Sequence, residues 1–419
     1  MPRIGSCLAW TALAFLALSV FDLAALAQTD VPASISIPSD EARFAAFLHD
    51  FRDEALKAGV RPETYDRAVA GLSLNLKVED LNLNQPEFVR PVWEYLASAV
   101  SDTRVKKGKE LIAANAQLFA RLEQDYGVPK EVLTAIWGME SAYGQSQGNF
   151  NLFEALATLA YDGPRAAYGR RQLIAALKVA EIEGLDPTAM TGSWAGAFGE
   201  TQFVPTTFLE RAVDGDGDGK RDVWNSPADA LASTANYLRQ AGWHAGEPWG
   251  EEVKLPADFP FAQADVDIRK NESDWGMMGV RTIADEPFNG DAVRGWIFLP
   301  AGYRGPAFFI RENFDAILKY NLATSYALAV SLLADRYKDS GRIAAAWPVE
   351  ESPLDQSSRM AIQTGLNALG YMLGEPDGVL GRRSRQAIRD YQKDRGLPAD
   401  GFATAALLTR ILNEEYLKR

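Results

Sequence analysis

The sequence is almost devoid of the side chains that supply thiol and imidazole chemistry. Its 419 residues contain one cysteine, Cys7, and two histidines, His49 and His244. This scarcity excludes a disulfide framework and thiolate zinc sites, and it leaves no cysteine nucleophile outside residue 7. A Ser-His-Asp triad would have to use one of the two histidines, and neither lies in a recognisable motif. The chemistry that remains is that of carboxylates.

Positive charge is also scarce. The chain has 43 Lys and Arg against 56 Asp and Glu, which gives a net charge of −13. Nucleic-acid binding depends on clustered Lys and Arg, so we expect no nucleic-acid partner. An acidic polymer would not be attracted by charge either, and contacts with it would come from hydrogen bonds and stacking. The 10 Trp and 14 Tyr residues are available for such contacts.

The N-terminus holds the only long apolar run. Arg3 precedes it, Leu8 to Leu26 form it with Asp22 as its single charge, and Ala25-Leu26-Ala27 end it in a small-x-small pattern. This pattern predicts a cleaved signal peptide over residues 1–27 and therefore export. The alternative is a membrane anchor, which Asp22 and the Ala-x-Ala ending disfavour. We expect no transmembrane segment after cleavage. Cys7 precedes the run and is badly placed for lipoprotein acylation.

The rest of the chain predicts a mainly α (α+β) protein. Helical periodicity begins at Ser39 and continues to Tyr126, and it returns from Phe314 to Tyr337. Between about 251 and 310, apolar residues alternate at period two with Pro and Gly between them, which predicts a small antiparallel subdomain. We therefore expect one domain over 39–338, a linker at 339–354 with no clean period, and a helical module over 355–417.

One glutamate lies on the apolar face of its predicted helix. In the segment PKEVLTAIWGMESAYG, residues 129–144, the apolar stripe includes Ile136 and Trp137. Three or four residues further lies Glu140, so its carboxylate shares the apolar face, and Gly144 is a natural C-cap. Burial and the negative helix end both predict a raised pKa, which suits a general acid acting on a glycosidic oxygen. The alternative is a glutamate buried against an arginine for structural reasons.

Three motifs in order resemble the lytic murein transglycosylase B family, a lysozyme-related group. They are the segment around Glu140, GSWAGAFGETQFVPTTF at 192–208, and ILKYN at 317–321. The resemblance covers roughly residues 40 to 338 and implies a lysozyme-like helical catalytic core. It implies that Glu140 is the catalytic acid and that Ser193, Gln202, Tyr320 and Asn321 line the sugar site. Arg165, in YDGPRAAYG, matches less securely a contact to a sugar or a peptide stem.

Each companion residue has a structural alternative. Asn321 is equally suited to cap a helix starting near Ser325, and Gln202 to satisfy backbone groups of its loop. Asp162 and Glu200 are the only acids near the motifs that offer a second carboxylate. The family pattern holds no carboxylate at either position, so we expect both to be solvated.

The resemblance also implies a reaction and a compartment. A single glutamate would cleave the MurNAc-β-1,4-GlcNAc bond of peptidoglycan in the periplasm, acting first as acid and then as base. The muramic acid end would close to a 1,6-anhydro ring, with no organic cofactor and no attacking water. One rival is a muramidase that hydrolyses the same bond, and another is a non-catalytic, calcium-stabilised wall-binding protein. The sequence indicates no protein partner.

An acidic loop predicts a bound cation. Residues 214–219 read DGDGDG, so Asp214, Asp216 and Asp218 occupy positions one, three and five of an EF-hand-like start. Lys220 would offer its carbonyl at position seven. The twelfth position departs from the pattern, and Asp229, four residues later, is the expected substitute. We expect a structural Ca²⁺; the alternative is an acidic surface turn.

The C-terminal helical module, residues 355–417, resembles the peptidoglycan-binding domain. The similarity rests on IQTGLNALGYMLGEPDGVLG, RRSRQAIRDYQKDRGLPADG and LLTRIL, with Asp-Gly turns at 377–378 and 400–401. Without the resemblance the same pattern predicts only a three-helix bundle. The resemblance implies that the module binds glycan strands, but it indicates no particular binding residues.

Overall fold

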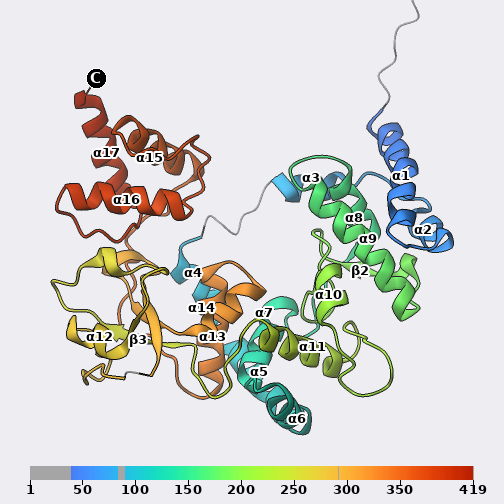
Figure 1. The fold of residues 1–419 in the computed structure, drawn as a ribbon, viewed down its shortest axis with the longest axis horizontal. Coiled ribbons are helices and arrows are strands. Elements are labelled where there is room, and N and C mark those ends of the chain that lie inside the picture. The colour runs from blue at the N-terminus through green and yellow to red at the C-terminus, as the bar shows by residue number, and fades with distance from the viewer. Residues whose placement is uncertain (1–38, 84–89, 291, 419) are drawn as a thin grey trace, which may run out of the picture. The chain divides into compact units, whose positions relative to one another are not determined.

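The structure is a computed structural model that describes residues 39–83, 90–290 and 292–418 (Figure 1). The predicted signal peptide, residues 1–27, lies outside the described residues. Within the described part, no single helix is long and apolar enough to cross a membrane. Helices α13 Glu312–Tyr320 and α14 Thr324–Tyr337 pass such a test only when joined across a sharp bend.

Helices form most of the chain before the sheet. Their bounds are α1 Asp40–Lys57, α2 Pro62–Val69, α3 Leu76–Leu83, α4 Val92–Ala99, α5 Asp102–Ala114, α6 Ala116–Tyr126, α7 Lys130–Ser141, α8 Leu152–Tyr161, α9 Ala166–Glu183, α10 Pro205–Arg211 and α11 Pro227–Gln240. One apolar cluster joins α1 and α2 to α8, α9 and α10. A second cluster buries α7 among α5, α6, α11, α13 and α14, and it contains Ile136 and Trp137. Burial of each large apolar side chain contributes about 1.5–3 kcal/mol to stability.

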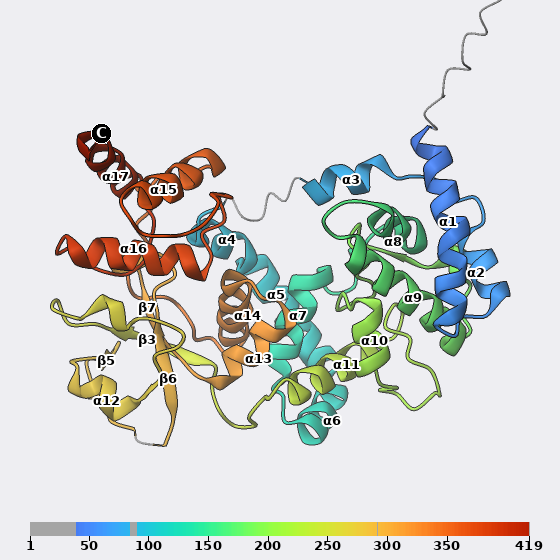
Figure 2. The same cartoon turned by 45° about the horizontal axis from the view of Figure 1, so that its top comes forward.

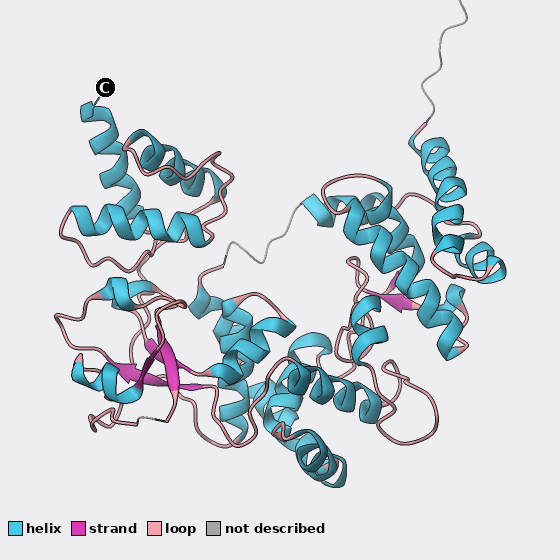
Figure 3. Cartoon of the chain, viewed as in Figure 1, coloured by secondary structure: helices cyan, strands magenta, loops and turns pink. Residues whose placement is uncertain are grey.

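The predicted antiparallel sheet is confirmed (Figure 3). Its five strands are β3 Gly250–Lys254, β4 Lys270–Asn271, β5 Arg281–Thr282, β6 Arg294–Phe298 and β7 Ala307–Ile310. They lie in the order β4-β6-β7-β3-β5, and each neighbouring pair is antiparallel. Trp275, on α12 Glu272–Met277, is fully buried against the sheet. A two-stranded ribbon, β1 Phe150–Asn151 with β2 Thr191–Gly192, starts the 192–208 motif.

The helical segment predicted from Phe314 to Tyr337 is divided into two helices. The structure has α13 Glu312–Tyr320 and α14 Thr324–Tyr337, bent by 118° at the break between them. Oδ1 of Asn321 accepts a 3.1 Å hydrogen bond from the backbone N–H of Ala323. Such local side-chain bonds compete with helical ones, so Asn321 ends the first helix. It does not cap the second helix as the alternative proposed, because the N-cap of α14 is Ala323, without a side-chain cap bond.

The C-terminal module contains α15 Gln356–Ala368, α16 Arg382–Asp394 and α17 Ala405–Lys418. Its core is separate from the others and includes Ile362, Ile388, Tyr391 and Ile411. The helical module expected from the sequence is thus present. Figures 1 and 2 both show α16 beside the sheet.

Candidate active site

The helix α7 presents Glu140 one residue before its end. Leu133, Ile136 and Trp137 bury the apolar stripe of α7, so the following turn brings Glu140 to the edge of the same core. The helix ends at Ser141, and its C-cap is Ala142, two residues earlier than the expected C-cap at Gly144. The next three residues all have positive φ, and two of them are not glycine: Ala142 at 50°, Tyr143 at 62° and Gly144 at 81°. Two such non-glycine residues in sequence are strained, a common property of active-site turns.

Glu140 has a neutral partner rather than a cationic one. The side chain is half-buried, and its Oε1 accepts a 2.6 Å hydrogen bond from the hydroxyl of Tyr326. Burial raises the pKa of Glu140 to about 7, while the Tyr326 hydroxyl lowers it. The predicted rise in pKa is confirmed. In the part of the chain that the structure describes, no Lys or Arg forms an ion pair with Glu140, contrary to the structural alternative.

Tyr326 is the functional candidate that the sequence motifs missed. It lies on the first turn of α14 and is 5% exposed, with only its hydroxyl directed at the acid. Tyr320, which the motif did indicate, lies near Glu140. Burial raises the pKa of the Tyr320 phenol, and the charge of Glu140 raises it further. The Tyr320 hydroxyl donates to the backbone carbonyl of Thr201 at 2.5 Å. The bend between α13 and α14 therefore brings both tyrosines to Glu140.

The 192–208 loop is fixed to the turn after Glu140. Gln202 has φ +52°, and its Nε2 donates to the carbonyls of Gln147 at 3.0 Å and Gly199 at 2.9 Å. It therefore satisfies backbone groups as the alternative for this residue anticipated. Oγ of Ser193 accepts a 3.0 Å hydrogen bond from the N–H of Ala197 within the same loop.

Arg165 lies beside this loop, whereas Asn321 is exposed at the break between α13 and α14. The Arg165 guanidinium stands over the ring of Trp194, with its carbon 5.5 Å from the ring centroid. Trp194 directly follows Ser193, so this arrangement joins the start of α9 to the 192–208 motif. The nearby Tyr168 hydroxyl donates to the carbonyl of Ala195 at 3.1 Å. Arg165 and Glu140, both described in the structure, form no hydrogen bond or ion pair with each other.

Glu200 is buried, so the expectation that it is solvated is wrong. It is 6% exposed, and its carboxyl packs against the Cα of Gly144, where an added Cβ would lie 3.1 Å from its Cδ. The backbone carbonyl of Glu200 accepts a hydrogen bond from Oγ of Ser141. Burial raises the pKa of Glu200 to about 7; the indole N–H of Trp137 lowers it and the charge of Asp222 raises it. The loop has no regular period, and no sequence signal indicated this burial.

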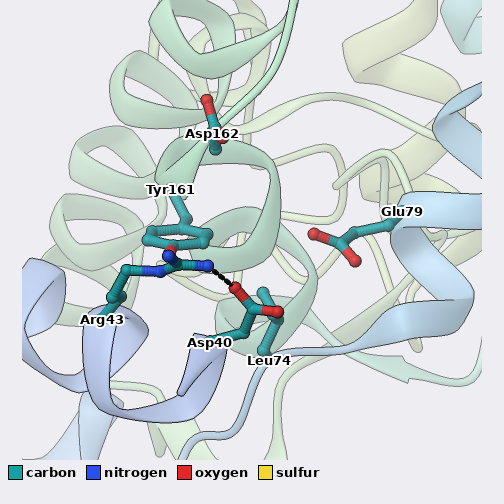
Figure 4. Close-up of a pocket in the computed structure, with 6 residues that line it drawn as sticks. All are labelled: Asp40, Arg43, Leu74, Glu79, Tyr161 and Asp162. Carbon is teal, nitrogen blue, oxygen red and sulfur yellow. Dashed lines mark hydrogen bonds and ion pairs between the residues drawn. The ribbon is translucent and has the colours of Figure 1, made fainter. Parts of the chain in front are cut away.

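Asp162, in contrast, is exposed as expected. It lines a cavity of about 440 Å³ together with Asp40, Arg43, Leu74, Glu79 and Tyr161 (Figure 4). Figure 4 shows Arg43 paired with Asp40 beside the ring of Tyr161. None of the residues bonded to Glu140 lines this cavity, so Asp162 belongs to a different part of the surface.

The acidic loop brings three carboxylates together. Oxygen atoms of Asp214, Asp216 and Asp229 lie within 4.8 Å of one another, which suits a hard cation. Asp229 is 1% exposed, and its two oxygens accept the N–H groups of Gly215 and Asp222, both at 2.7 Å. Burial raises the pKa of Asp229, and nearby acids raise it further, so a cation would relieve an unfavourable charge. Asp218 is not part of the cluster; its carboxylate accepts the N–H of Lys220 instead. The carbonyl of Lys220 stays a predicted ligand.

Comparison with known proteins shows the family of this chain. The family model described as Transglycosylase SLT domain matches residues 43–335. The chain belongs to this family. A second model, described as Putative peptidoglycan binding domain, matches residues 355–411. The resemblances expected from the sequence for the catalytic core and for the C-terminal module are thereby confirmed.

Relatives within the transglycosylase family include solved structures. SltB3 from Pseudomonas aeruginosa, in complex with NAG-anhNAM-pentapeptide, is 48% identical with a TM-score of 0.85, covering 88% of this chain and 99% of its own. SltB1 from the same organism is 30% identical with a TM-score of 0.63, covering 70% and 100%. Membrane-bound lytic murein transglycosylase B from Escherichia coli is 33% identical over 211 residues. That match spans 50% of this chain and only 57% of the relative.

Proposed function

We propose that this chain is a peptidoglycan lytic transglycosylase that cleaves the MurNAc-β-1,4-GlcNAc bond with Glu140 as its single acid and base. The observation that carries the proposal is the pairing of a half-buried carboxyl with a neutral tyrosine hydroxyl. Because burial raises the pKa of Glu140 to about 7, a large fraction of the carboxyl is protonated near neutral pH. A general acid for glycoside cleavage needs that protonated form.

The reaction balances with one carboxyl. Glu140 gives its proton to the glycosidic oxygen, the bond from that oxygen to C1 of the muramic acid breaks, and the GlcNAc end leaves as an alcohol. The C6 hydroxyl of the muramic acid then attacks C1, and its proton returns to Glu140. The product end is a 1,6-anhydro ring, and no water is consumed. Attack by a hydroxyl already tethered to the reacting ring has a large proximity advantage.

Neighbouring residues have distinct proposed roles. Tyr326 holds Oε1 of Glu140 in place and stabilises the carboxylate between the two steps. Tyr320 fixes the loop at Thr201, which positions Gln202 and Ser193 for contacts with the sugar. Asn321 and Arg165, at the break between α13 and α14 and at the start of α9, are proposed contacts to the sugar or peptide stem.

A muramidase would need a second carboxylate to activate water, and among the described residues Glu200 is the buried acid that lies at the catalytic turn. Oε2 of Glu200 is enclosed, and the carboxyl packs on Gly144. A base for water must reach a solvent molecule beside the sugar, and Glu200 is only 6% exposed. The chemical form of the sugar end in digested sacculi decides between the two functions.

Relatives support the same reaction. Structures of SltB3 from Pseudomonas aeruginosa hold NAG-anhNAM-pentapeptide and NAG-NAM-pentapeptide, an anhydro sugar and its non-anhydro counterpart. We further propose that residues 1–27 direct export to the periplasm. There residues 39–338 would cleave the glycan strands and residues 355–417 would bind them.

We also propose that the acidic loop holds a structural Ca²⁺ through Asp214, Asp216 and Asp229. An Escherichia coli relative, Slt35, has been solved in complex with calcium; it is 27% identical with a TM-score of 0.60, covering 72% of this chain and 94% of its own. The oxygen-only donor set fits that ion. Its contribution would be to neutralise three acids and stabilise the loop before α11.

A further inference from the structure

A largely buried ion pair joins the C-terminal module to the segment between β3 and β4. Arg389, on α16, forms an ion pair with Asp265, and its Nη2 donates to the carbonyl of Ala264 at 3.1 Å. The Arg389 and Asp265 side chains are only 12% and 17% exposed. Separation of the module from the sheet would leave each charge without this partner. Such pairs are strongly destabilised when one partner is lost.

A second contact needs a glycine on the sheet side. Asp400, 9% exposed, accepts the backbone N–H of Tyr303 on its Oδ2 at 2.8 Å. Its Oδ1 accepts Nε2 of Gln392 from its own module, also at 2.8 Å. Gly302 has φ +70°, and an added Cβ would lie 2.7 Å from Oδ2 of Asp400 and 2.9 Å from Cβ of Phe402. Only glycine permits so close an approach with that backbone conformation.

The segment between the two domains, residues 339–354, is fixed to the first domain by hydrogen bonds and apolar packing. The backbone N–H groups of Ala344 and Ala345 donate to the two carboxylate oxygens of Glu252, on β3, at 2.7 and 2.8 Å. Ile343 and Trp347 pack against the apolar cluster that contains α7. These contacts restrict bending of residues 339–354, so the segment is not a flexible tether.

We propose that the C-terminal module is a fixed arm, docked on the sheet through Asp265–Arg389 and Asp400–Tyr303, which presents a bound strand at one set spacing from Glu140. A flexible tether would raise the local substrate concentration over a range of distances, whereas a docked module favours only bonds at the matching distance. The spacing would select which bond of a long strand reaches the acid. This role rests on the proposed function, but the docking itself does not.

The docking is tested by distances between spin labels in the exported chain, which has no cysteine after residue 7. Labels at Thr409→Cys on α17 and Lys254→Cys on β3 occupy exposed positions on the two sides. We expect a narrow distance distribution that broadens in Arg389→Glu and narrows again in the exchanged pair Asp265→Arg with Arg389→Glu. Lys393→Glu, an exposed charge reversal on α16, should leave it narrow. A broad distribution before any charge reversal, or an exchanged pair that stays broad, would overturn the docking.

The functional role has a separate readout. Arg389→Glu should lower turnover of intact sacculi relative to short soluble muropeptides by about tenfold, while Lys393→Glu keeps the wild-type ratio. An unchanged ratio in Arg389→Glu, once its distances have broadened, would overturn the spacing role. Because the distances are measured without substrate, failure of the lytic activity itself would appear independently, as inactivity of every variant.

Discussion

The hydroxyl of Tyr326 donates a 2.6 Å hydrogen bond to Oε1 of Glu140 across 186 positions of the sequence. It is a neutral donor, so it orients the carboxyl without holding it ionised as an arginine would. Burial outweighs this hydrogen bond, and the pKa of Glu140 rises to about 7. The pair therefore gives an acid that both donates and recovers a proton near neutral pH.

Removal of this donor should move the pH profile. In Tyr326→Phe the carboxylate loses a hydrogen bond worth about 1.5–3 kcal/mol, so the pKa of Glu140 should rise by about one to two units. The first step needs the protonated acid, and activity falls as pH rises through that pKa. We expect the alkaline limb of kcat/KM to move to higher pH by the same amount. If the alkaline limb of kcat/KM stays at the same pH and only kcat falls, Tyr326 acts through packing alone.

Glu140→Gln should fold normally and lose activity by at least about 100-fold, because an amide cannot donate the proton. Lysis of sacculi by the purified variant measures the loss, and thermal unfolding checks the fold. Glu131→Gln, on the first turn of the same helix, is the matched control and should retain activity. Activity of Glu140→Gln within a few-fold of the wild type would remove the proposed catalyst.

Glu200→Gln should keep most lytic activity, because an amide resembles the protonated acid that the buried site favours. The substitution should instead change how thermal stability depends on pH. The folded pKa of Glu200 is raised from 4.5 to about 7, so its stabilising contribution is full below pH 4.5 and is lost as pH rises through 7. The wild-type Tm should therefore fall between pH 5 and pH 8, and by less in Glu200→Gln. Inactivity as complete as that of Glu140→Gln would instead favour a two-carboxylate hydrolase.

Calcium should raise the Tm, by an amount that grows with the logarithm of its free concentration above Kd. Asp214→Ala should abolish the rise, because it removes one of the three clustered carboxylates. Asp258→Ala, an exposed acid outside the loop, should preserve it. Identical melting curves in chelator and in millimolar calcium would contradict the site.

The sequence predicted what depends on regular periodicity. The apolar stripe of α7 put Glu140 on a buried face, and alternation at period two located the sheet, because both patterns follow from local geometry. Tyr326 was missed because its approach to Glu140 depends on a 118° bend between α13 and α14. No period encodes such a bend; only Asn321 indicated a helix boundary there.

Loop residues were the harder part. Glu200 lies in a glycine-rich loop whose path depends on hydrogen bonds with Ser141 and Val223, so its burial had no local signal. The EF-hand pattern placed Asp214 and Asp216 correctly in one cluster, and Asp229, the expected substitute for the twelfth ligand, lies in the same cluster. Asp218 followed the pattern in sequence but lies outside the cluster, because its carboxylate caps the N–H of Lys220.

The central claim is that Glu140 acts without a second carboxylate, and the form of the muramic acid end tests it most directly. Sacculi digested with the purified enzyme would be analysed by mass spectrometry, with and without borohydride reduction. The account predicts a primary product lighter than the reducing sugar by one water and resistant to borohydride, since its anomeric carbon is closed in the 1,6-anhydro ring. A dominant product with a reducible muramic acid end would contradict it and identify a muramidase.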